Sequence, residues 1–319
     1  MLEFIIGRAG SGKSSYCLQS VTKELQKAGT GRKIFLILPE HMTFRTEWEL
    51  ARRQSGGGFS RAYVYGFRRL ARQVLLETGG AALPRLTEVG QRLLYTKVLT
   101  GKKKELRLLG RAARQRNFTQ SLAGMVEELK SYAVSPEMLQ SAGEQMPEGE
   151  FRDKLADLAA VYQGICKEME GRYNDAEDLL TAFAGKIPES SLLAGAEIWL
   201  DGFVFFNPQE RMILQALLQT AANVHVTLCL ENTAMENAEE TALFHRQWQT
   251  LQMLQHLAGD LDLPVQVKTM ENPVRYKEKA LAHLEQHLFS YPLQKCAQGQ
   301  GIRLVEAGNR RQGVEAVAA

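Results

Sequence analysis

Apolar runs of strand length alternate with stretches of helical period in the first part of the chain. The runs occupy residues 2–6, 33–38 and 62–65. Each is followed by apolar residues at helical spacing, over 15–26, 43–54 and 67–76. A short continuous apolar run followed by an amphipathic helix is typical of a β–α unit with a buried parallel strand. Three such units predict an α/β fold with a doubly wound parallel sheet.

The pattern changes between residues 84 and 187. Apolar residues there keep a helical period throughout, and no run of strand type occurs. Lysines 102–104 and the arginines at 111, 114 and 116 give this stretch a basic flank, which is usually a solvated face and is also compatible with nucleic acid. The sequence therefore predicts an all-helical insertion within the α/β fold.

Strand-like runs return after the insertion, at 197–203, 224–230 and 265–267, with helices expected over 208–222 and 241–257. Pro208 is suited to the first turn of its helix. We therefore expect four parts: the first half of the α/β domain (1–83), the helical insertion (84–187), the second half of the domain (188–295) and the start of a following domain (296–319).

The first strand runs directly into a glycine-rich loop with the pattern Gly-x-x-x-x-Gly-Lys-Ser. Backbone N–H groups of such a loop surround a phosphate, and the helix N-terminus adds partial positive charge. Lys13 is expected to reach the outer phosphates of ATP, and the Ser14 hydroxyl to bind Mg²⁺. The predicted nucleotide-binding residues are Gly7, Arg8, Ala9, Gly10, Ser11, Gly12, Lys13 and Ser14.

A P-loop site also needs a second strand that ends in an acidic residue, which holds the hydrated magnesium ion. Asp201 follows an apolar strand at its carboxyl end, where ligands of parallel sheets bind. Helicase-type enzymes usually carry a glutamate next, to polarise the attacking water, and here that position is Gly202. The alternative is an Asp that caps a turn. We hypothesise that the site binds ATP and hydrolyses it poorly, with no catalytic residue assigned.

Composition narrows the class of protein. The 319 residues carry a net charge of +3, which allows a nucleic-acid partner without requiring one. Four scattered cysteines predict free thiols and no zinc or iron–sulfur site in this stretch. No signal peptide or membrane-length apolar run is present, so a cytoplasmic protein is expected. The tail has a strand-like run at 302–305 and then enters a helix without a terminator, which suggests a piece of a longer protein.

Several segments together resemble the AddB family, the B subunits of bacterial AddAB helicase–nucleases of the UvrD-like superfamily 1. They are the glycine-rich loop, residues 38–44, 67–71 and 201–210, and the tail 306–315, and the likeness covers the whole chain. The resemblance implies a RecA-like P-loop domain with a helical insertion. It also implies that a nuclease domain with an iron–sulfur cluster lies in a part of the subunit that is absent here.

The family resemblance also implies partners. In this family the B subunit is not the motor; it pairs with an AddA-type helicase/nuclease subunit in processing double-strand breaks for recombination. It passes single-stranded DNA through a channel that scans for a hotspot sequence (Chi). His41 and Arg72 stand where Gln and Trp are expected, a departure that concerns which DNA sequence is recognised. The predicted DNA contacts are His41, Thr43, Phe67, Arg69, Arg72, Phe205 and Phe206.

Two other functions remain open. A small-molecule kinase also uses a P-loop, although it would be expected to bring an arginine-rich lid rather than a long helical insertion. A scaffold with a vestigial P-loop is compatible with Gly202. For Phe67 and Arg69 the alternatives are a core aromatic and a solvated arginine. DNA binding separates the first function from the kinase, and nucleotide affinity separates it from the scaffold.

Overall fold

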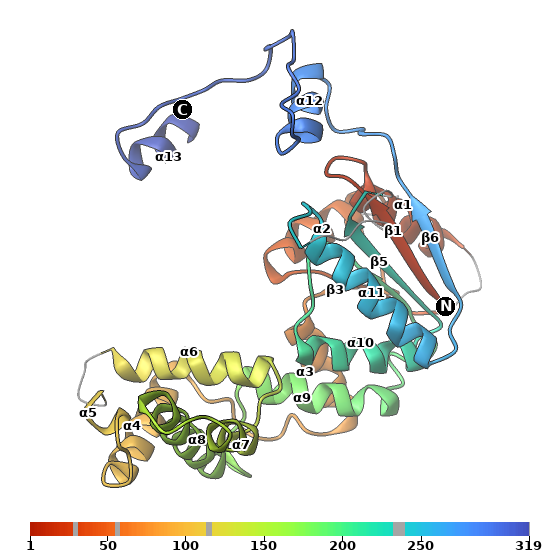
Figure 1. Ribbon diagram of the computed structural model, residues 1–319. Coiled ribbons are helices and arrows are strands. Elements are labelled where there is room, and N and C mark those ends of the chain that lie inside the picture. The colour runs from red at the N-terminus through yellow and green to blue at the C-terminus, as the bar shows by residue number, and fades with distance from the viewer. Residues whose placement is uncertain (28–30, 55–57, 113–116, 232–239, 319) are drawn as a thin grey trace.

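A six-stranded, all-parallel sheet forms the centre of the molecule, with strand order β3-β2-β4-β5-β1-β6 (Figure 1). The computed structural model describes residues 1–27, 31–54, 58–112, 117–231 and 240–318. The predicted α/β class with a parallel sheet is therefore confirmed. The strands are β1 (Leu2–Gly7), β2 (Ile34–Ile37), β3 (Ala62–Tyr65), β4 (Glu197–Leu200), β5 (Asn223–Cys229) and β6 (Val265–Thr269).

Helices cover both faces of this sheet. Because side chains alternate along a strand, Phe4 and Ile6 of β1 enter one core while Ile5 enters the other. The Ile5 face packs on α1 (Lys13–Gln26) and α2 (Glu40–Arg52). The opposite face carries the larger core and packs on α3 (Phe67–Thr78), α9 (Ala176–Lys186), α10 (Pro208–Thr220) and α11 (His245–Asp260).

The described residues between α3 and α9 form helices with a core of their own (Figure 1). Val126, Val161 and Ile165 are fully buried at its centre. Lys130 joins this bundle to the start of α9 by ion pairs of 2.7 Å to Asp175 and 2.6 Å to Asp178. The helices are α4 (Glu88–Lys102), α5 (Leu109–Ala112), α6 (Phe118–Ser131), α7 (Pro136–Glu144) and α8 (Glu150–Met169).

The structure differs from the expected boundaries at three places. The α9 helix lies within the expected insertion (84–187), but it packs with α3 and α10 against the core of the sheet. The 3₁₀ turn η1 (Ile187–Glu189) spans the expected boundary and packs on α9 and α10. The helix expected over 43–54 begins earlier, because α2 starts at Glu40, and the Thr43 hydroxyl donates to the Glu40 carbonyl at 2.9 Å. The predicted domain limits themselves stay a prediction.

The third difference lies in the tail, where residues 302–305 form no strand. A strand needs a neighbour for its backbone groups, and no described strand lies beside this segment. The tail helices are α12 (Lys279–His287) and α13 (Arg310–Ala318), and α13 buries no residue and stands apart from the sheet (Figure 1). Within the described ranges, no helix combines the length and apolarity that a membrane crossing requires.

Candidate functional site

The glycine-rich loop connects the end of β1 to the beginning of α1. Gly10 and Gly12 have positive φ angles of 80° and 91°, which only glycine adopts without strain. Gly12 is the residue that precedes the helix, so the N–H groups of the first helical turn have no capping side chain. This is the backbone geometry that the P-loop sequence predicts for an anion site.

Two polar side chains of the loop, those of Lys13 and Ser11, have incomplete sets of hydrogen-bond partners among the described residues. The Lys13 ammonium donates to the carbonyls of Gly7 at 2.7 Å and Arg8 at 2.8 Å, so its contacts are to the loop itself. Burial lowers the pKa of Lys13, because an ammonium removed from water is less favourable. The Ser11 hydroxyl is buried without a hydrogen-bond partner, and Ser14 is exposed.

Asp201 directly follows β4, with β5 between it and the P-loop strand. Its side chain is 8% exposed, and the Thr227 hydroxyl of β5 donates to Oδ1. Ser14 and Asp201 line the same cavity of about 370 Å³, together with His41, Arg45 and Arg275. The structure thus brings together two residues that the sequence predicted as magnesium ligands.

The donor set fits magnesium. A hydroxyl and a carboxylate are the hard oxygen ligands that Mg²⁺ prefers, and Mg²⁺ usually completes its shell with phosphates and waters. No group of three potential His, Cys, Asp or Glu ligands exists among the residues described. Ser14 and Asp201 would hold the ion, and the ion would neutralise phosphate charge.

Gly202 occupies a position that disfavours a side chain. Its φ is 85°, and a Cβ atom there would lie 2.8 Å from the Met42 sulfur and 3.4 Å from Pro39. A glutamate at this position would therefore require a strained backbone and a shift of the Met42 side chain.

Loops that follow β2, β3 and β4 lie against one another. The Glu40 carboxylate occupies the space beside Gly66, and Met42 the space beside Gly202. Of the predicted DNA contacts on the helices that follow β2 and β3, His41, Arg69 and Arg72 are exposed and Thr43 is half-buried. The Arg69 guanidinium lies over the Tyr65 ring at 4.4 Å, and Phe205 is 48% exposed.

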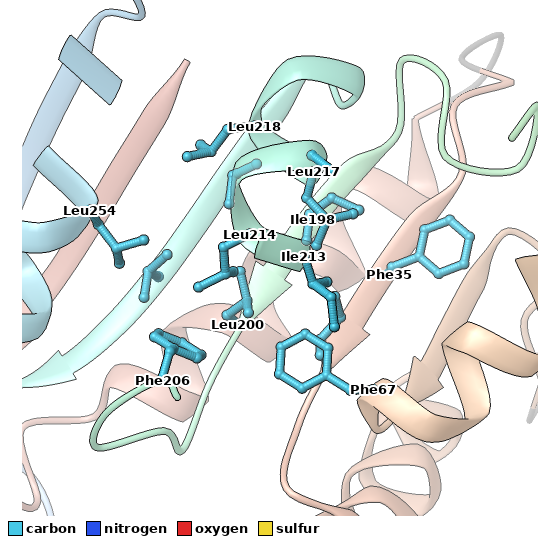
Figure 2. Packing of buried hydrophobic residues seen from close by; sticks show 14 of the residues in the cluster. Phe35, Phe67, Ile198, Leu200, Phe206, Ile213, Leu214, Leu217, Leu218 and Leu254 are labelled. Carbon is cyan, nitrogen blue, oxygen red and sulfur yellow. The ribbon is translucent and has the colours of Figure 1, made fainter. Parts of the chain in front are cut away.

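Phe67 and Phe206 are core residues instead. They are 6% and 1% exposed, and their rings lie 6.5 Å apart among aliphatic side chains of β4 and α10 (Figure 2). The expectation that these rings stack on bases finds no exposed ring face here, because α10 covers them. For Phe67 the packing matches the alternative of a core aromatic at a helix start.

Two exposed features were missed from the sequence. Phe44 and Trp48 are 81% and 54% exposed and lie one turn apart on α2, beside the predicted contacts; their i, i+4 spacing was the available signal. Arg275, from the segment after β6, lines the cavity with Ser14 and Asp201. No local sequence pattern indicates a role for Arg275, because only the tertiary structure brings this residue to the cavity.

A parallel sheet with a Gly-x-x-x-x-Gly-Lys-Ser loop after its first strand and an acid after a nearby strand places the chain in the α/β class, with the layout of a nucleotide-binding site. Comparison with known proteins makes this more specific. Residues 4–285 match the model of the family described as "ADDB, N-terminal", and the chain belongs to this family.

Curated relatives of the chain are named as B subunits of an ATP-dependent helicase/deoxyribonuclease. The chain is 42% identical to the protein of Desulforudis audaxviator over 325 residues, which is 99% of this chain. It is 40% identical to the protein of Desulforamulus reducens and 37% identical to that of Geobacillus kaustophilus, again over 99% of this chain. The chain spans 28% of the length of each of these three relatives.

Proposed function

We propose that this chain is the part of an ATP-dependent helicase/deoxyribonuclease B subunit that binds ATP and single-stranded DNA. The observation that carries the proposal is the cavity shared by Ser14 and Asp201 at the carboxyl end of β4, with Lys13 next to Ser14 on the loop after β1. The relatives' name supplies the context of DNA processing. Because the chain belongs to this family, the alternative function of a small-molecule kinase is disfavoured.

ATP with Mg²⁺ is the proposed ligand, held in a RecA-like P-loop domain. The N–H groups of the loop bind phosphate oxygens, and Lys13 exchanges its two carbonyl partners for the outer phosphates. Ser14 and Asp201 hold the magnesium ion. This exchange replaces neutral acceptors by charged ones, which strengthens the hydrogen bonds of the ammonium.

Weak hydrolysis belongs to the same proposal. The backbone conformation at Gly202 and its contact with Met42 disfavour the glutamate that would polarise water. Gly202→Glu should therefore fail to create ATPase activity. Phosphate release by the wild-type chain alone, abolished by Lys13→Ala, would contradict this part of the proposal.

DNA binding is assigned to residues on α2 and α3, which follow β2 and β3, and in the loop after β4. Arg69 and Arg72 offer charge to phosphates, Phe205 offers a ring for stacking, and His41 and Thr43 offer polar contacts. The whole subunit is proposed to work in the cytoplasm with an AddA-type partner at double-strand breaks, scanning for the Chi hotspot. Any iron–sulfur cluster and nuclease site belong to the part of the relatives that this chain does not span.

Fluorescence anisotropy of a labelled single-stranded oligonucleotide tests the DNA assignment. We expect binding that weakens with salt, because contacts to phosphates release counterions. Arg69→Gln and Arg72→Gln should each weaken binding several-fold and reduce the salt dependence, whereas Lys23→Gln, at the far end of α1, should not. Phe205→Ala should cost about 1–3 kcal/mol of binding free energy. Absence of binding at low salt, also in the full-length subunit with its partner, would refute the assignment.

A further inference from the structure

The chain that leaves β6 returns across the glycine-rich loop. We call residues 270–276 the strap. Its first N–H, of Met270, donates to the Ile6 carbonyl at 2.8 Å and so extends the pairing of β6 with β1. Further on, the N–H groups of Val274 and Arg275 both donate to the Gly10 carbonyl, at 2.9 and 3.1 Å. The strap is therefore fixed to the loop by backbone hydrogen bonds.

Glycines of the loop permit this close approach. A Cβ atom on Gly10 would lie 2.8 Å from the Tyr276 ring, and one on Gly12 would lie 3.0 Å from the Val274 side chain. At Gly7 a Cβ atom would meet the Met270 carbonyl oxygen at 2.5 Å. The glycines that a phosphate site requires are thus also the residues against which the strap packs.

The α12 helix, which follows the strap, contacts the same loop. The Arg8 Nε donates to the Glu285 carboxylate at 3.1 Å, and its Nη2 donates to the Glu285 carbonyl. Arg8 also pairs with Glu231, at the end of β5. Arg8 is thereby engaged with acidic partners. Of the two arginines that line the cavity, Arg45 pairs with Glu49 at 2.9 Å, which leaves Arg275 as the arginine to consider for a ligand.

Arg275 differs from Arg8 in having no such partner. It lines the cavity that contains Ser14 and Asp201, its side chain is exposed, and no acidic group within the described ranges lies at ion-pair distance from it. After burial, which is the largest cause, the positive charge of Arg275 also lowers the pKa of Lys13. The two cations therefore lie within electrostatic reach of each other, close to the Asp201 carboxylate, whose charge raises the pKa of Lys13.

We propose that Arg275 binds the outer phosphates of the nucleotide together with Lys13, and that the strap is the element that positions it. This assignment rests on the proposed nucleotide binding. Ser14 and Asp201, on the magnesium side of the site, share the cavity with Arg275, so the guanidinium is on the side of the outer rather than the inner phosphates. A guanidinium suits this role because it can donate two parallel hydrogen bonds to one phosphate.

The test is a comparison of affinities for Mg-ATP and Mg-ADP by isothermal titration calorimetry on the 319-residue chain. Arg275→Gln should weaken ATP binding about tenfold, as expected for one charge-assisted contact, and ADP binding less than about twofold. Arg275→Lys should recover part of the ATP affinity. Lys277→Gln, a neighbouring exposed lysine outside the cavity lining, is the matched control and should bind as wild type.

The possible results distinguish a failure of the Arg275 assignment from a failure of the proposed nucleotide binding. Wild type that binds ATP, with Arg275→Gln unchanged, would overturn the role of Arg275 and leave the proposed function intact. Equal loss of ATP and ADP affinity would contradict the assignment to the outer phosphates. Wild type that binds neither nucleotide would refute the proposed function itself, and the Arg275 assignment with it. Thermal unfolding of each variant checks that the exposed substitution leaves the fold unchanged.

Discussion

The three adjacent strands β4, β5 and β1 carry polar clusters at both of their ends, and the two clusters differ in how well they are partnered. At the amino ends, His225 lies between Glu3 and Glu197, with each ring nitrogen 2.6 Å from a carboxylate oxygen. Its ring stacks on Trp199 at 3.9 Å. At the carboxyl ends, and among the described residues, the Lys13 ammonium donates to two backbone carbonyls and the Ser11 hydroxyl has no hydrogen-bond partner.

We infer from this difference that the cluster at the amino ends contributes to the stability of the fold, whereas the cluster at the carboxyl ends binds a ligand. A buried polar group with complete partners contributes to a unique fold, whereas one without partners carries a cost that a ligand can relieve. At the amino ends one imidazole joins two carboxylates, because each ring nitrogen lies at hydrogen-bond distance from a carboxylate oxygen. The carboxyl ends are also where parallel sheets bind ligands. We therefore expect mutations at the two ends to affect different measurements.

The largest effect is expected from His225→Ala at the amino ends. Removing the imidazole leaves the partly buried carboxylates of Glu3 and Glu197 without this partner, which should lower the free energy of unfolding by about 3 kcal/mol. Urea unfolding measures this, and His256→Ala, on the exposed side of α11, is the control. Nucleotide affinity of the folded variant should be unchanged. A large loss of nucleotide affinity in His225→Ala without a loss of stability would contradict the assignment of the amino-end cluster to stability.

The second effect concerns the carboxyl ends. Asp201→Asn keeps an oxygen that can accept the Thr227 hydrogen bond but removes the charge that would bind magnesium. Mg-ATP affinity should fall by about 1.5–3 kcal/mol, which is roughly 10- to 100-fold, with a small change in stability. Calorimetry with and without Mg²⁺ measures it, and Asp260→Asn at the end of α11 is the control. Unaltered magnesium dependence would exclude Asp201 as a ligand.

Ser11→Ala should have a smaller effect on stability, of opposite sign. Its hydroxyl is buried and unpaired, so its removal should raise the free energy of unfolding of the ligand-free chain by about 1 kcal/mol. The exposed Ser60→Ala should change nothing. A destabilised Ser11→Ala would mean that the hydroxyl is already satisfied without a ligand.

The smallest effect is a dependence of stability on pH at the amino ends. Burial favours the neutral form of Glu197, but hydrogen bonds from His225 and Asn223 outweigh it and lower the pKa of this carboxyl. With the folded pKa below the unfolded one, this stabilisation is complete above the unfolded value of about 4.3 and is lost as pH falls through the folded value. Urea unfolding below pH 5 should therefore show a smaller acid loss in His225→Gln than in wild type.

How much the sequence predicted depends on the range of the interactions involved. Each of the six strands was predicted from a short apolar run, and the cavity that joins Ser14 to Asp201 agrees with the carboxyl-end rule. Phe67 and Phe206 could not be placed, because an aromatic beside a turn is buried only if a distant helix, here α10, covers it. Arg275 was missed for the same reason, since the strap meets the loop through tertiary contacts.

The most direct test of the central claim is the thermal unfolding temperature of the chain with and without Mg-ATP. A ligand that binds only the folded state raises this temperature by mass action. We predict a rise in wild type and in His225→Gln, relative to each protein without ligand, and none in Lys13→Ala. An equal rise in Lys13→Ala, or no rise in wild type at millimolar nucleotide, would contradict the claim that the incompletely partnered end of the sheet is the nucleotide site.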